Sequence, residues 1–185
     1  MTEPGYPLTS KRRRLPDEGH IEVFVADEQS AHPVDSARWQ LLAEQVLEAE
    51  RIRGEAELSL LFVDEATMAE LNKRFMDAEG PTDVLAFPLE DDLVGAGRWP
   101  DNGPTGPANN RVELDEAPLL LGDVVICPAV AAKNAAEHAA TYDDELALLV
   151  VHGILHVLGM DHADPEEEAA MQAKEQDLLG RFHWK

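Results

Sequence analysis

The chain has 185 residues, which suits one domain with some residues left for tails or insertions. Apolar residues make up 44% of it, and no uncharged apolar run reaches eighteen residues, so we expect a folded core and no membrane span. The single cysteine excludes an intrachain disulfide and favours a cytoplasmic protein. A net charge of −22 disfavours DNA and other polyanions as partners unless a local site overrides it.

The first part of the chain is predicted to be a flexible tail. Proline, glycine and charged residues dominate residues 1–20, which leaves little to bury. No apolar stretch follows the basic run Lys11–Arg14, so the tail does not resemble a secretory signal. The basic run is either a solvated segment or an arm that contacts RNA or the ribosome. Residues 21–180 are expected to form the single folded domain.

Hydrophobic periodicity predicts four strands and five helices in that domain. The strands are predicted at 21–27, 57–64, 84–89 and 119–127, and the helices at about 36–47, 65–75, 128–140, 144–158 and 165–179. Pro88 lacks a backbone donor, which places its strand at a sheet edge. Residues 91–118 hold four glycines and four prolines, which predicts a long loop or insertion. The element order is typical of an α+β fold with a small sheet covered by helices.

Three histidines lie close together in the segment VHGILHVLGMDH, which ends at His162. His152 and His156 are four residues apart, so on a helix they project from one face. Gly159 can end that helix in a left-handed conformation and let the chain bring His162 back. Three imidazoles around one point are the ligand set of a catalytic zinc site. We therefore predict one bound transition metal ion. Zn²⁺ is the preferred candidate, although imidazole also suits nickel and other divalent ions.

The other four histidines, His20, His32, His138 and His183, lack such neighbours and are interpreted as ordinary. The spacing of the three clustered histidines also matches the HExxHxxGxxH pattern of the metzincin proteases. That pattern has a glutamate as general base where this chain has Gly153. A glycine inside a helix costs about 1 kcal/mol relative to alanine, so we interpret Gly153 as required for space. A protease is the weaker alternative.

Three segments resemble the YbeY endoribonucleases, also called rRNA maturation factors. The segment HGILHVLGMDH fits the family hallmark HGxLHxxGxDH. Residues 81–88, PTDVLAFP, resemble the family's PTDVLSFP, and residues 121–128, LGDVVICP, resemble its LGDIVI strand. The likeness covers roughly residues 20–90 and 119–180. It implies an α+β fold with a small mixed β-sheet packed with helices and a metalloprotease-like, zinc-bearing helix.

The resemblance also implies an activity. It is single-strand-specific cleavage of RNA by a zinc-dependent endoribonuclease in the cytoplasm, acting in 16S rRNA 3′-end maturation and ribosome quality control. The partners would be rRNA and the small ribosomal subunit, and the metal ligands would be His152, His156 and His162. Zinc on three imidazoles lowers the pKa of its water to about 7, which yields either a nucleophile or a base for the ribose 2′-OH. The alternative is a ribosome-associated factor with a mainly structural zinc.

Four further residues bear on the substrate groove or on the metal ligands. Thr82 and Asp83 either line the groove as substrate-binding residues or form a strand-entry turn. Asp161 either supports the metal ligands from outside or belongs to a turn. Met76 stands where the family commonly has an arginine, in LNxxYR, so the arginine's role in catalysis or RNA contact does not carry over. We expect Met76 at the exposed end of the short helix at about 65–75, whose predicted apolar face is Met68, Leu71 and Phe75.

Overall fold

The computed structural model describes residues 20–52, 54–89, 118–161 and 163–184. The predicted tail up to residue 19, most of the predicted loop at 91–118, and His162 lie outside the described residues. Within them, the strands are β1 (Ile21–Asp27), β2 (Ala56–Phe62), β3 (Val84–Pro88) and β4 (Leu119–Ile126). The helices are α1 (Ser36–Ala49), α2 (Glu65–Met76), α4 (Pro128–Glu137), α5 (Tyr142–Val157) and α6 (Pro165–Phe182). The α+β prediction is confirmed.

The four strands form one mixed sheet in the order β1-β2-β4-β3. β1, β2 and β4 run parallel, while β3 pairs with β4 in the antiparallel sense, from Val84 opposite Ile126 to Pro88 opposite Gly122. β3 therefore lies at the sheet edge, as the missing donor of Pro88 predicts. This edge strand later forms one wall of the candidate site.

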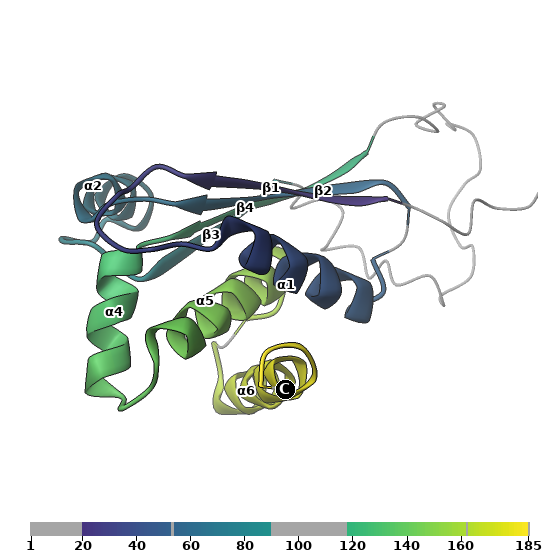
Figure 1. The fold of residues 1–185 in the computed structure, drawn as a ribbon. Coiled ribbons are helices and arrows are strands. Elements are labelled where there is room, and N and C mark those ends of the chain that lie inside the picture. The colour runs from purple at the N-terminus through teal and green to yellow at the C-terminus, as the bar shows by residue number, and fades with distance from the viewer. Residues whose placement is uncertain (1–19, 53, 90–117, 162, 185) are drawn as a thin grey trace, which may run out of the picture.

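Helices cover the two faces of the sheet unequally (Figure 1). One face packs against α1 and α5, and α6 packs on the outer side of these two helices. The main core lies between these elements, with Leu60, Phe62 and Val124 contributed by the sheet. On the other face, α2 covers only a smaller cluster around Met68 and Val125. No helix in the described part of the chain is long and apolar enough to cross a membrane.

α5 is the central helix on the covered face of the sheet, and most of its residues are buried. Apolar residues occur on all sides of this helix, as expected for a helix enclosed between a sheet and other helices. It starts at Tyr142, two residues before the predicted start, because the Thr141 hydroxyl caps it and Asp144 completes a capping box. It ends as predicted, with Gly159 in the left-handed region at φ 91°.

Two other helix ends differ from the sequence prediction. α4 stops at Glu137 rather than near residue 140, because Ala139 takes a left-handed conformation at φ 54°. α6 continues to Phe182, beyond the predicted end at residue 179, and the N–H groups of His183 and Trp184 bond the carbonyl of Leu179. Burial of Leu179 at the end of α6 stabilises this last turn against the core.

The apolar face predicted for α2 is correct only in part. Met68 is fully buried, but Phe75 is 52% exposed. Its ring leans edge-on against Phe87 of β3, with centroids 5.0 Å apart. The helix ends at Met76, which is also 52% exposed, and Asp77 follows in a left-handed conformation. The predicted exposed position of Met76 is therefore confirmed.

Candidate functional site

The candidate site begins with two histidines on the last turns of α5. His152 and His156 project from the same face, and their Nε2 atoms lie 3.0 Å apart. The two rings meet edge to face, with centroids 4.5 Å apart. Both side chains are half-buried, so they are fixed by the helix yet reach the surface. The four-residue spacing thus brings two ring nitrogens to one point, as the sequence predicts.

A third side chain reaches this pair from α6. Nδ1 of His152 lies 2.7 Å from Oε1 of Glu175, a residue that is only 7% exposed. An ionised carboxylate only accepts hydrogen bonds, so Nδ1 of His152 is the donor and carries the proton. In the neutral ring, Nε2 then keeps its lone pair and presents it toward His156. Glu175 is not among the site residues predicted from the sequence, although an acid within the otherwise apolar stripe of α6 is a signal that could have indicated it.

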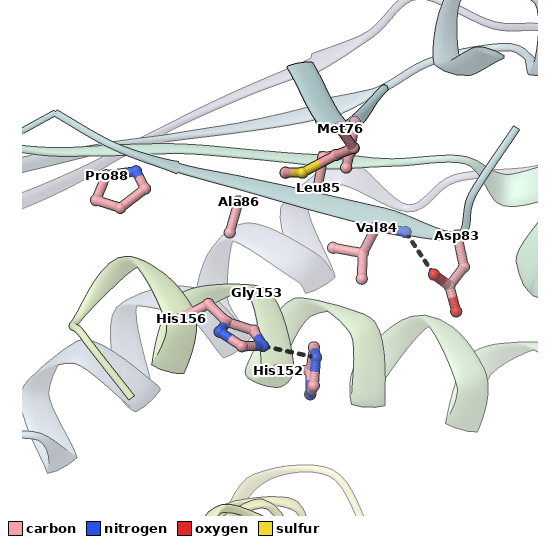
Figure 2. A pocket seen from close by; sticks show the side chains of 9 residues that line it. All are labelled: Met76, Asp83, Val84, Leu85, Ala86, Pro88, His152, Gly153 and His156. Atoms are coloured by element: carbon pink, nitrogen blue, oxygen red, sulfur yellow. Dashed lines mark hydrogen bonds between the residues drawn. The ribbon is translucent and has the colours of Figure 1, made fainter. Parts of the chain in front are cut away.

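The histidines open onto a pocket of about 330 Å³ that follows the edge strand β3. Its lining residues come from α2, β3 with the residue before it, and α5: Met76, Asp83, Val84, Leu85, Ala86, Pro88, His152, Gly153 and His156. Figure 2 shows Val84 and Ala86 pointing from β3 toward α5, with Met76 on the other side of the strand. Among these described lining residues, none is lysine or arginine. An anionic substrate would therefore meet few fixed positive charges here.

Asp83 lies at the end of this pocket, where β3 begins (Figure 2). Its Oδ1 accepts hydrogen bonds from the Val84 backbone N–H at 2.8 Å and the Thr82 hydroxyl at 3.1 Å. Its Oδ2 accepts a bond from the side-chain amide of Asn134 on α4, at 3.1 Å. Asp83 thus ties α4 to the start of β3, and Thr82 is directed at Asp83. The substrate role proposed for the two residues stays a prediction.

The donor set at the histidine pair fits a transition metal. Two nitrogens on one tetrahedral zinc ion, each about 2.0–2.1 Å from it, are roughly 3.3 Å apart. The observed 3.0 Å between the Nε2 atoms is close to that separation. Within the described residues, no three His, Cys, Asp or Glu side chains form a metal-holding group. The third predicted ligand, His162, is outside those residues, and the predicted role of Asp161 stays open.

The remaining described histidines lie away from the pocket. Nε2 of His183 bonds Asp144 at 2.8 Å, next to the indole of Trp184, so this pair ties the C-terminal turn to the start of α5. His138 is exposed and stands 3.6 Å from the buried Glu145. The Thr141 hydroxyl, followed by His183, lowers the pKa of Asp144 to about 2. These contacts are structural, at the opposite end of α5 from the site.

Fold and site together define a class of protein. It is an α+β protein with a histidine pair on a buried helix, facing a pocket along the edge strand of a mixed sheet. The model of one protein family, endoribonuclease YbeY, matches residues 24–183. This chain belongs to the endoribonuclease YbeY family, as the three resembling segments indicate.

Relatives support this membership, and one solved structure shares the fold. A Frankia casuarinae endoribonuclease YbeY is 44% identical over 163 residues, which cover 88% of this chain and 75% of the relative. A Salinispora tropica endoribonuclease YbeY is 45% identical over 162 residues, covering 88% of this chain and 96% of the relative. A Thermotoga maritima protein solved in solution shares the fold, with a TM-score of 0.51, 24% identity, and coverage of 86% and 91%.

Proposed function

We propose that this protein is a zinc-dependent endoribonuclease that cleaves single-stranded RNA in the cytoplasm. Its substrate would be the 3′ region of 16S rRNA on the small ribosomal subunit, in rRNA maturation and ribosome quality control. Family membership supports the endoribonuclease activity. The observation that carries the metal dependence is the 3.0 Å approach of two Nε2 atoms at the mouth of an open pocket.

The residues of the chain divide the work at this site. His152 and His156, with His162 as the third predicted ligand, would hold the ion. When bound, Zn²⁺ supplies an activated water and neutralises charge on a phosphoryl oxygen. Met76, Ala86 and Pro88 give the pocket an apolar rim against which an unstacked base can lie. Because the lining residues that the structure describes include no lysine or arginine, RNA phosphates depend on the ion for charge compensation.

The two alternatives to this proposal are a protease and a protein with a structural zinc, and both are less well supported. A protease with this helix would need a general base at the position of Gly153, which carries no side chain. A purely structural zinc site is closed by four protein ligands. The described histidine pair instead borders a pocket. The missing base disfavours a peptide substrate, and the pocket beside the histidines favours a catalytic zinc over a structural one.

The test is cleavage of a labelled single-stranded fragment from the 3′ region of 16S rRNA. Zinc-loaded wild-type protein is expected to cut it, to spare the matched duplex and to lose activity with a chelator. His156→Ala should be inactive, whereas the control His138→Ala, whose side chain is 64% exposed, should be as active as the wild type. Zinc uptake without RNA cleavage would contradict the proposed endoribonuclease activity and favour a structural zinc. Cleavage of a peptide would favour a protease.

A further inference from the structure

A buried carboxylate interrupts the apolar stripe of α6. The residues that this helix buries are Met171, Glu175, Leu178 and Leu179. Their spacing places them on one face, toward α5. Three of them are ordinary core residues, but a buried acid is costly unless it is paired and hydrogen-bonded. Glu175 at 7% exposure therefore requires a specific partner.

That partner is His152. Among the described residues, the hydrogen bond from His152 Nδ1 at 2.7 Å is the one that Glu175 makes. The neighbouring Lys174 is turned away, because its Nζ pairs with Glu50, the residue that follows α1, at 2.7 Å. The carboxylate thus serves one ring nitrogen of one histidine. Its position on α6, 23 residues further along the chain, sets the orientation of a side chain on α5.

The hydrogen bond has a chemical consequence at the other side of the ring. With the proton held on Nδ1, the lone pair of His152 is on Nε2, the atom that faces His156. A metal ion binds a neutral imidazole through such a lone pair, and a carboxylate on the opposite nitrogen fixes both the tautomer and the ring orientation. Without the carboxylate, part of the His152 population would carry its proton on Nε2 and could not bind.

We propose that Glu175 is a positioning residue that holds His152 as the Nδ1–H tautomer and aims its Nε2 at the metal position. This role rests on the proposed metal-dependent function, and it adds a residue from α6 that touches neither the ion nor the RNA. The orientation of His152 therefore depends on how α6 packs against α5. Loss of such a partner typically weakens metal binding about 10–100-fold.

The test compares three variants of the full-length protein. Glu175→Met removes the acceptor and leaves a side chain that suits the apolar stripe, while Glu175→Gln keeps an acceptor oxygen without the charge. Lys174→Met is the matched control, because it breaks the adjacent ion pair with Glu50 and leaves His152 untouched. Zinc affinity is measured by competition with a chromophoric chelator. The tautomer of His152 is read from the ¹⁵N shifts of its ring in metal-free protein at neutral pH.

The expected results separate positioning from packing. Glu175→Met should bind zinc about 10–100-fold more weakly and show Nε2–H signals for His152, with thermal stability equal to or above that of the wild type. Glu175→Gln should lose less affinity, and Lys174→Met none. Tight binding by the wild type and by Glu175→Met alike, with the His152 tautomer unchanged, would overturn the role of Glu175. A wild-type protein that binds no zinc would overturn this role together with the metal site.

Discussion

A Cβ atom placed on Gly153 would lie 2.4 Å from Cγ1 of Val124. Nonbonded carbon atoms do not approach so closely, so the backbone of α5 packs directly against β4 one residue beyond His152. The interpretation that Gly153 is required for space is thereby confirmed. A glutamate at this position, as in the protease pattern, would have to displace the side chain of Val124.

Gly153→Ala is expected to destabilise the protein. Overpacking against Val124 destabilises the fold by about 1–3 kcal/mol, and the higher helix propensity of alanine offsets about 1 kcal/mol of this loss. We expect a net loss of roughly 1 kcal/mol in the free energy of unfolding, measured by urea denaturation of metal-free protein. Gly180→Ala on α6 is the control, because its added methyl group meets nothing within 4 Å and should stabilise the helix. Equal stabilisation by both variants would refute the close packing of α5.

Met76→Arg tests how the pocket meets the RNA backbone. Met76 lines the pocket, is 52% exposed and ends α2, so an arginine fits there without entering the core. A charge-assisted contact to a phosphate is worth roughly 1.5–3 kcal/mol when well formed, although nearby Asp77 and Glu79 offset part of it. We expect unchanged thermal stability and tighter RNA binding or faster cleavage.

The control for that variant is Leu41→Arg. It adds the same charge on α1, at a side chain that is 54% exposed and does not line the pocket. RNA affinity of this control should rise much less, because the added charge is distant from the site. If Met76→Arg lowers stability and leaves RNA affinity unchanged, Met76 is a packing residue and the phosphate contact is absent.

The pH dependence of stability should report Asp144. Its pKa is lowered from 3.8 to about 2, first by the Thr141 hydroxyl and then by His183. A carboxyl with a depressed folded-state pKa adds stability that is complete above pH 3.8 and is lost as the pH falls toward 2. Because the side chain is 34% exposed, we expect this contribution to be only about 1 kcal/mol.

The measurement is the unfolding free energy of wild-type and Asp144→Asn protein at pH 7, 5 and 3. The variant should be less stable by a constant amount at pH 7 and 5, and the difference should shrink at pH 3. Asp177→Asn, which removes an exposed ion pair with Arg181, should cost less than about 0.5 kcal/mol. A deficit of Asp144→Asn that stays the same at pH 3 would show that the carboxyl charge is not what stabilises this end of α5.

Local patterns in the sequence predict much of this fold. The i, i+4 spacing of His152 and His156, the glycine after α5 and the proline of β3 each have a consequence within one turn or one strand. Such short-range features follow from backbone geometry alone. The strand ranges are predicted within one or two residues for the same reason.

Contacts between distant elements were not predictable in this way. The hydrogen bond between His152 and Glu175 depends on how α6 packs on α5. The hydrogen bond between Asp83 and Asn134 depends on how α4 packs against the start of β3. The strand order β1-β2-β4-β3 likewise joins segments far apart in the chain. Periodicity marks which face of an element is buried, but it does not say which neighbour covers that face. This is why Phe75, expected in the core, lies half in solvent.

Metal stoichiometry is the most direct test of the central claim that His152 and His156 share one ion. Purified wild-type protein and the variants His152→Ala, His156→Ala and His162→Ala are analysed for zinc after dialysis against a trace of the metal, beside the exposed-histidine control His138→Ala. Two imidazoles hold zinc far more weakly than three, so each of the first three variants should lose most of its metal, while wild type and control retain about one ion per chain. Full occupancy in His152→Ala and His156→Ala would contradict the site.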